Sequence, residues 1–168
     1  MAKKKTKTVS DGTIATNRRA KYDYQILDTY EAGIALVGSE VKALRSGYSI
    51  RIEESHIQQM DMTRTHTMEI EIVNLHIPEY RQANRFNGHV PVRPRKLLLH
   101  KREIRKIVDT ITKGGCTAIP LKMYFNDDGR IKVLLGVAKG KKTVDKRQNI
   151  KDREWNISKQ RTLKHYNQ

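Results

Sequence analysis

Apolar residues that could build a core are concentrated in the middle of this chain, and both ends lack them. Residues 1–16 are rich in Lys, Thr, Ser and Gly, and residues 139–168 carry only scattered apolar side chains. Segments with so little to bury do not offset the entropy lost on folding. We therefore expect a disordered basic N-terminus over 1–16, one folded domain over 17–138, and a basic tail over 139–168 that stays disordered until a partner binds it.

The pattern inside the folded part alternates with a period of two over several short runs, which is typical of strands. Two segments instead have helical spacing. The first starts at Ser39, a plausible N-cap, and ends at Gly47, and the second covers 100–113 and is stopped by Gly114 and Gly115. A proline-rich stretch, 78–94, is expected to be a long loop. The pattern predicts a mostly β fold with helices, built as a small barrel from strands in 22–37, 50–52, 56–60, 68–72, 116–125 and 131–138.

Positive charge is confined to three blocks. The chain has 34 Lys and Arg against 18 Asp and Glu, a formal net charge of +16. Residues 1–21 and 93–106 carry +6 each and 139–168 carry +7, so the remaining residues carry a net charge of −3. Clustered bases commonly neutralise phosphates through counterion release. We favour a nucleic-acid partner over two alternatives, a tail that only keeps the chain soluble and a surface that meets anionic lipid.

Several kinds of chemistry find no support in the motifs. A single cysteine, Cys116, excludes an internal disulfide, and no Cys or His spacing suits a metal. The segment 136–143 resembles a phosphate-binding loop but has the wrong spacing. No run of apolar residues is long enough to cross a bilayer. We expect a cytoplasmic protein without catalytic residues, metal or cofactor, and with neither a membrane nor a small-molecule substrate as its partner.

Two acids and a few aromatic residues remain as candidates for a role in binding. Glu31 and Glu40 lie near expected strand ends in a basic protein. Each could form a surface ion pair or a favourable charge at a helix N-terminus. Glu31 could instead accept hydrogen bonds from RNA, or orient a base such as Lys42 or Arg45. The aromatic residues that could stack on bases, although some are as easily part of the barrel, are Tyr22, Tyr24, Tyr80 and Trp155.

Several strings, taken together, resemble the SsrA-binding protein family, also called small protein B. The match runs in order over about residues 13–164. Its motifs are long, which makes chance agreement negligible. The strings that carry the resemblance are Asn17–Tyr24, Glu31–Leu36, Gly38–Arg45, Arg95–Glu103, Gly136–Lys142, Asp145–Arg147 and Arg153–Trp155.

The resemblance implies an oligonucleotide-binding-type closed β-barrel that binds the tRNA-like domain of transfer-messenger RNA and carries it to stalled ribosomes for trans-translation. It implies no enzymatic step. The positions implied to bind RNA are Asn17, Arg19, Tyr24, Glu31, Lys42, Arg45, Arg95, Lys96, Leu98, Lys132, Lys139, Lys141 and Lys142. The tail implied to enter the decoding region and mRNA channel of the small subunit includes Asp145, Lys146, Arg147, Arg153, Trp155, Ile157 and Arg161.

The chain departs from the family's pattern at Val144, where the family usually has His or Tyr, and at Glu79 and Gly88–Pro91 in the long loop. Valine cannot hydrogen-bond through its side chain and stacks poorly on a base. Rival interpretations are a general RNA chaperone or a structural ribosomal protein. Either would bind RNA broadly through backbone charge and stacking, whereas the first interpretation requires one folded RNA. A metal-dependent nuclease would need clustered acids, but the acid pairs Glu53–Glu54 and Asp127–Asp128 are adjacent in sequence and so point apart in a strand or lie in a turn.

Overall fold

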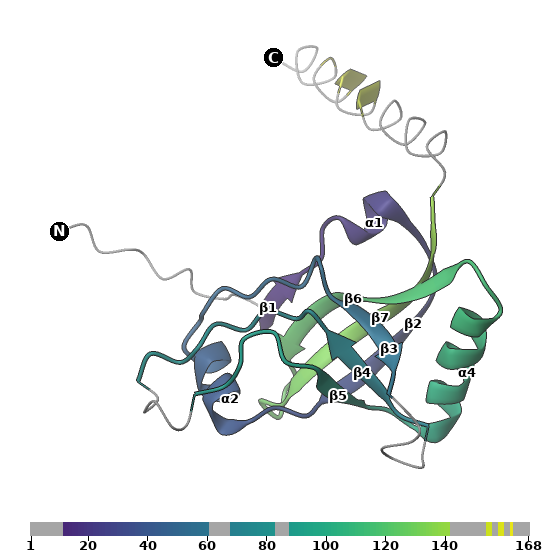
Figure 1. The fold of residues 1–168 in the computed structure, drawn as a ribbon. Coiled ribbons are helices and arrows are strands. Elements are labelled where there is room, and N and C mark those ends of the chain that lie inside the picture. Colours follow the sequence, from purple (N-terminus) through teal and green to yellow (C-terminus); the bar gives the residue numbers. More distant parts are fainter. Residues whose placement is uncertain are drawn as a thin grey trace.

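The computed structural model describes residues 12–60, 68–82 and 88–141, together with Glu154, Trp155, Ser158, Lys159 and Thr162. Within these residues the protein is mostly β with some helices (Figure 1). The strands are β1 (Thr13–Thr16), β2 (Tyr24–Ile34), β3 (His56–Gln59), β4 (Ile70–Val73), β5 (Arg95–Leu98), β6 (Cys116–Phe125) and β7 (Ile131–Gly140). The helices are α1 (Ala20–Asp23), α2 (Gly38–Arg45) and α4 (Lys101–Thr112).

All the strands belong to one sheet in the order β1-β6-β3-β4-β5-β2-β7, and β7 also pairs with β6. The pairings therefore return to their starting point, with β1 added outside the circuit on β6. The three long strands, β2, β6 and β7, make the most extensive antiparallel ladders. Figure 1 shows α4 along one side of these strands and α2 on the other.

The hairpin of β6 and β7 confirms the two strands expected over 116–125 and 131–138. Its turn uses the predicted turn residues. The Arg130 N–H donates to Asn126 Oδ1 at 2.7 Å, and Gly129 has a φ of 70°. That left-handed conformation costs glycine little because it has no Cβ.

Alternation along each strand sends apolar side chains into the core and polar ones outward. In β4, Ile70 and Ile72 are fully buried, and in β5 Arg95 and Leu97 point inward while Lys96 and Leu98 are exposed. Period-two geometry requires this pattern. Each exposed residue of these strands therefore has a buried neighbour in the sequence, and the packing of that neighbour in the core holds the strand in position.

Both longer helices were predicted, but one cap differs. The α4 helix buries Ile104, Ile107 and Val108 against the strands, as its spacing predicts. The α2 helix ends at the predicted glycine: the Gly47 N–H donates to the Leu44 carbonyl and the Tyr48 N–H to the Ala43 carbonyl. The prediction that Ser39 is the N-cap of α2 was wrong.

The cap residue of α2 is Val37, whose N–H donates to the Glu40 carboxylate at 2.8 Å. The helix N-terminus is therefore capped by the carboxylate of the third helical residue, which accepts from the N–H of the cap residue, as the Glu of a capping box does. Ser39 lies inside the helix, and its hydroxyl is 3.0 Å from Nδ1 of the buried His89. The His89 Nε2 lies 3.1 Å from the Ile77 carbonyl.

Three short elements were not predicted. Thr13–Thr16 form β1 on the edge of β6, so the expected boundary after residue 16 is wrong for these four residues. The segment Ala20–Asp23 is a single helical turn rather than the start of a strand. Arg95–Leu98 form β5, and the strand expected over 50–52 is reduced to one bridge between Arg51 and His76.

In the part of the chain that the structure describes, no helix is both long enough and apolar enough to cross a membrane. The disorder predicted for residues 1–11 lies outside the described residues. So does the same prediction for most of the tail after Lys141.

Candidate functional site

Three polar side chains meet on the outer face where β2, β6 and β7 run side by side. Lys132 lies directly opposite both Gly33 on β2 and Tyr124 on β6, and Glu31 is two residues before Gly33 on the same face. The Tyr124 hydroxyl donates to Glu31 Oε2, and Lys132 Nζ lies 3.2 Å from Glu31 Oε1. We call Glu31, Tyr124 and Lys132 the outer cluster.

The outer cluster holds a charged carboxylate in contact with water. Glu31 is half exposed, and its pKa is lowered first by the Tyr124 hydroxyl and then by Lys132. The same hydrogen bond raises the pKa of Tyr124 to about 12. Lys122 Nζ lies 5.2 Å from the centre of the Tyr124 ring, a cation–π contact that adds a second positive charge. The cluster therefore presents a carboxylate held between a phenol and an ammonium group.

Leu98 is exposed beside the outer cluster, at the junction of two open hollows. Its exposed fraction is 52%, which is high for a large apolar side chain. It lies opposite Gly33, where an added Cβ would come within 3.2 Å of the Leu98 Cβ. Glycine at position 33 therefore permits Leu98 to sit against β2.

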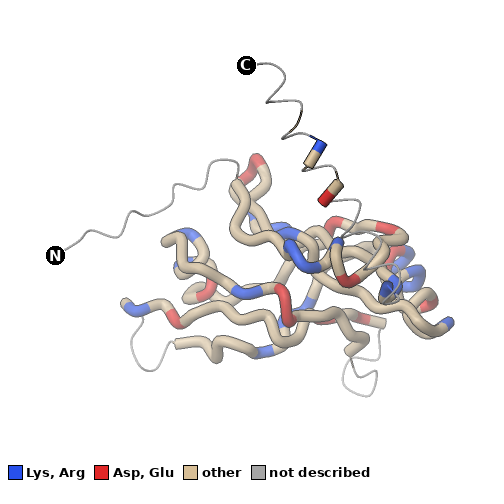
Figure 2. Tube along the Cα trace, turned by 90° about the horizontal axis from the view of Figure 1, so that it is seen from above, with Lys and Arg blue, Asp and Glu red and all other residues tan. Residues whose placement is uncertain are grey.

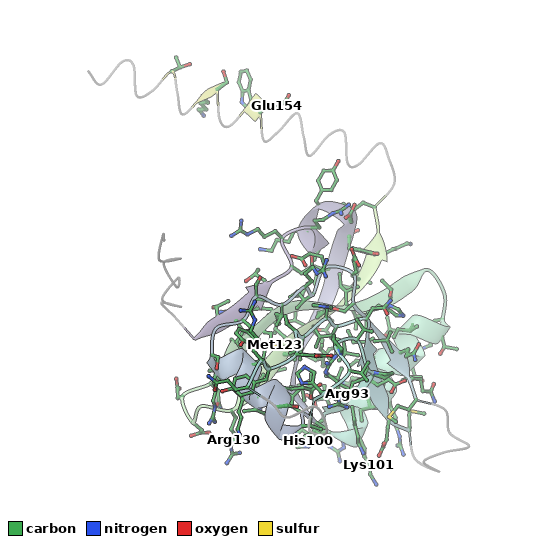
Figure 3. All side chains as sticks on the ribbon, turned by 60° about the vertical axis from the view of Figure 1, so that its left-hand side comes forward. Arg93, His100, Lys101, Met123, Arg130 and Glu154 are labelled. Carbon is green, nitrogen blue, oxygen red and sulfur yellow. The ribbon has the colours of Figure 1, made fainter. Side chains whose placement is uncertain are left out.

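The two hollows share Leu98 and Lys132; the first is lined by three lysines and three glutamates, including Glu103, and the second by three bases and Asp128. The first also contains Glu31, Glu69, Lys96 and Lys101, with Lys96 Nζ 2.6 Å from Glu69 Oε1. The second contains Arg45 from α2 and Arg130 from the β6–β7 turn. Figure 3 shows the labelled side chains of Arg130 and Lys101 extending outward along the same lower edge of the body. The hollows therefore offer lysines and arginines that can meet phosphates next to an exposed leucine and carboxylates that can accept hydrogen bonds.

Two residues assigned to RNA from the sequence have interior positions. Arg95 is 1% exposed; its guanidinium donates to Glu40 and to the carbonyls of Leu75, Pro91 and Arg93. Asn17 is 7% exposed and bridges the Pro120 carbonyl and the Ala20 N–H. Their polar groups are used inside the protein. We therefore correct both from contact residues to residues that position the surrounding backbone.

Glu40 lies at the centre of a buried ion-pair cluster. Arg93 contacts its two oxygens at 2.9 and 2.6 Å, and Arg95 contacts one at 2.8 Å. Burial alone would raise the pKa of Glu40, but these donors and the Val37 N–H outweigh it and lower the pKa. The surface pair considered for Glu40 is thus a buried one. We call Glu40, Arg93 and Arg95 the inner cluster.

The remaining assigned residues are spread over the surface. Lys42 is exposed on α2 beside a hollow that also includes Arg93. In the described part of the chain, the hydrogen bond and ion pair of Glu31 are with Tyr124 and Lys132, and not with Lys42 or Arg45. Arg19 is exposed and lies 3.7 Å from Asp23. Tyr24 packs beside the small core group around Ala20, and Lys139 is exposed at the end of β7.

Lys141 lies where the body meets the tail. Its N–H donates to the Asp23 carbonyl and its Nζ to the Lys21 carbonyl. Of the assigned tail residues, only Trp155 is described, and it is 71% exposed. The others, together with Lys142, lie outside the described residues: Asp145, Lys146, Arg147, Arg153, Ile157 and Arg161.

Sequence reasoning missed Tyr124 and Arg93. Tyr124 follows the buried Met123 in a strand that had been predicted, so alternation alone would have placed it on the outer face next to Lys132. Arg93 lies in the long loop, where no periodic signal exists. Within the described residues no group of His, Cys, Asp and Glu is arranged to hold a metal ion.

Comparisons with known proteins give a consistent result. The model of the SmpB protein family matches residues 14–165. The SsrA-binding protein of Afipia carboxidovorans is 50% identical over 164 residues, 98% of each chain. That of Bradyrhizobium sp. strain BTAi1 is 51% identical with the same coverage.

A solved structure described as "tmRNA-SmpB: a journey to the center of the bacterial ribosome" shares 46% identity with this chain. It superposes with a TM-score of 0.60 and covers 77% of this chain and 85% of its own. A family match over nearly the whole length, with relatives at about half identity, leaves one assignment: the chain belongs to the SmpB protein family.

Proposed function

We propose that this protein binds the tRNA-like domain of transfer-messenger RNA and delivers it to stalled ribosomes for trans-translation, in which the ribosome is rescued and the nascent peptide tagged. The observation that carries the proposal is the near-complete match to proteins named SsrA-binding protein. The neighbouring solved structure, whose description names tmRNA, SmpB and the bacterial ribosome, supports it. The proposal assigns recognition and delivery to the protein, with no bond made or broken by it, and places its work in the cytoplasm.

We further propose that the sheet is a closed barrel of the oligonucleotide-binding type. The circuit of pairings through β6, β3, β4, β5, β2 and β7 supports this closure. Such barrels commonly bind nucleic acid across one strand face and its neighbouring loops. The outer cluster and Leu98 lie on β2, β5, β6 and β7, which is compatible with binding on that outer face.

The outer cluster would read the RNA through complementary groups. Lys132 and Lys96 neutralise phosphates, and exposed Leu98 packs against a base or sugar in place of water. Glu31 accepts hydrogen bonds from base N–H groups or 2′-hydroxyls, which a folded RNA elbow with unstacked bases offers. Tyr124 holds the Glu31 carboxylate in place. Lys42 and Arg45 extend the basic surface onto α2.

Recovery of RNA from a bacterial lysate on the immobilised full-length protein, followed by sequencing, tests the proposal. We expect one dominant RNA with a tRNA-like end, bound far more tightly in a direct titration than an unrelated tRNA of equal length. A broad mixture of single-stranded RNAs would contradict the proposal and favour a general RNA chaperone. Enrichment of ribosomal RNA alone would favour a structural ribosomal protein.

Division of labour between body and tail is part of the proposal. A chain truncated after Lys142 keeps β7 and the outer cluster, so it should bind the tRNA-like domain with nearly unchanged affinity. The same truncation should abolish peptide tagging on stalled ribosomes in a reconstituted translation assay, because the tail is proposed to enter the empty mRNA channel. A comparable loss of RNA affinity in the truncated protein would refute this division.

A further inference from the structure

The outward face of α4 carries a row of bases that the outer cluster does not include. Lys101, Arg102, Arg105 and Lys106 are all exposed, while Ile104 on the opposite face is buried in the core. Figure 2 shows Lys and Arg positions, interspersed with Asp and Glu, at the right of the view. Residues three and four apart on a helix are neighbours, so Arg102, Arg105 and Lys106 form one short ridge.

These bases differ from the other bases near the candidate site in forming no ion pair with a described residue. Exposed Asp109 nevertheless lies on the same helix face, and the pKa of Asp28 is lowered first by the Tyr30 hydroxyl and in smaller part by the charge of Lys106. Lys96 contacts Glu69, Lys132 contacts Glu31, and Arg93 contacts Glu40. Among the residues that the structure describes, no ion pair is recorded for Lys101 or for the three ridge bases. The acid within their run, Glu103, accepts the His100 N–H at 3.0 Å. The ridge can therefore meet a phosphate without first breaking a pair.

The helix also begins at the edge of the first hollow. Lys101 and Glu103 line that hollow together with Glu31, Leu98 and Lys132. The three ridge residues do not line the hollow themselves, so a ligand seated over the outer cluster would pass Lys101 first and reach the ridge by extending further along α4. An RNA duplex offers closely spaced phosphates along such a path.

Resting on the proposed function, we propose that the ridge of Arg102, Arg105 and Lys106 binds the phosphate backbone of a double-stranded arm of the same RNA whose folded elbow occupies the outer cluster. The ridge reads no sequence, because phosphates carry none. It adds affinity and fixes the direction in which the arm leaves the protein. The source of the phosphates is RNA duplex rather than a lipid surface, since the face has no exposed apolar row beside its charges.

The experiment replaces all three ridge residues with Gln and measures affinity for the tRNA-like domain of transfer-messenger RNA between 50 and 200 mM salt. Three lost phosphate contacts should lower the log–log salt slope by roughly 2.7, so affinity should fall about 40-fold less across this range. The matched control, with the same net charge, replaces Lys21, Arg51 and Arg81 with Gln. These residues are exposed and lie on other elements. A further variant, Arg102→Lys with Arg105→Lys, keeps the charge and should keep the slope.

A second RNA, the same domain without its duplex arm, separates the ridge from the general effect of charge. The ridge variant should have a lower slope than wild type on the complete RNA and an equal slope on the armless one. A slope matching that of the control variant on the complete RNA, or an equal loss on both RNAs, would overturn the inference. If the wild-type protein prefers neither RNA over an unrelated tRNA, the proposed function itself fails; if it prefers both and the ridge has no effect, only the inference fails.

Discussion

The outer and inner clusters each hold one glutamate with cationic partners, but they differ in their access to water. Glu31 is half exposed with Tyr124 and Lys132 as partners, whereas Glu40 has 0% of its side chain exposed and two arginines plus a backbone N–H. Exposed ion pairs contribute little to the free energy of folding, because water competes for both charges. A buried pair, once formed, is costly to break. The same chemistry can thus serve recognition in the outer cluster and architecture in the inner one.

The largest expected effect comes from breaking the inner cluster. Glu40→Ala leaves Arg95 charged and buried without its partner, which typically costs about 3–5 kcal/mol. Urea denaturation of full-length protein measures this loss. Glu31→Ala is the matched control and should lower the free energy of unfolding by about 1 kcal/mol or less. Equal losses for the two variants would show that burial does not distinguish the clusters.

The outer cluster should give the opposite ranking in RNA binding. Glu31→Ala removes an acceptor and frees Lys132, and hydrogen bonds to charged groups contribute about 1.5–3 kcal/mol, so affinity for the tRNA-like domain should fall by roughly 10- to 100-fold. Charge counting alone predicts tighter binding, because an acid facing phosphate is removed. Titration at fixed salt decides between the two. Tighter binding by Glu31→Ala would remove Glu31 from the site.

Glu31→Gln sharpens that result. The amide keeps an acceptor oxygen but loses the charge. Retention of most of the affinity would favour acceptance of a hydrogen bond from RNA over pairing with Lys132, and a loss equal to that of Glu31→Ala would favour the ion pair. Either outcome refines the role of the outer cluster.

Acid should remove the contribution of the inner cluster to the stability of the fold. The pKa of Glu40 is lowered below its unfolded value of 4.5 in the folded protein. Its contribution to stability is therefore complete above about pH 4.5 and is lost as the pH falls through the lower folded value. Thermal unfolding measured from pH 6 down to pH 3 should show a steeper decline in wild type than in Glu40→Gln. Parallel curves would contradict the assignment.

The smallest effect is expected for the tyrosine that holds Glu31. Tyr124→Phe removes one hydroxyl while keeping the ring under Lys122, so RNA affinity should fall by up to about 10-fold, the size of one ordinary hydrogen bond. Tyr30→Phe is a matched control, because the Tyr30 hydroxyl donates to Asp28 at 2.7 Å and consecutive residues of a strand such as Tyr30 and Glu31 point to opposite sides. Equal effects of the two changes would show that Tyr124 has no special role.

Strong local signals made the largest elements predictable. The β6–β7 hairpin and α4 follow from alternation, turn residues and helical spacing within one continuous segment. The short strands β1 and β5 were missed because four residues contain too few repeats of a period and are held by partners distant in sequence. Thr13 pairs with Tyr124, and Leu97 with Ile34. Such pairings depend on the whole fold rather than on the local pattern.

The same limit applies to where the proposed site residues lie. The resemblance proposed Glu31, Leu98 and Lys132, and the structure brings them together because three strands lie side by side. It also proposed Arg95 as a contact residue, although Arg95 and Lys96 point to opposite sides of β5. Without the strand being recognised, the direction of each side chain could not be assigned. Arg95 and Lys96 are both basic, and they differ in that Arg95 is buried and Lys96 is exposed.

The bonds of Lys141 set a limit on where the tail can act. Its N–H and its ammonium group fix the end of the body to the turn at Lys21–Asp23. Trp155 follows 14 residues later. A chain extends at most about 3.6 Å per residue, so Trp155 can lie no more than roughly 50 Å from Lys141, and an α-helix over the same residues would shorten this to about 21 Å. Wherever the body is held, any binding site for Trp155 must therefore lie within a sphere of that radius around Lys141.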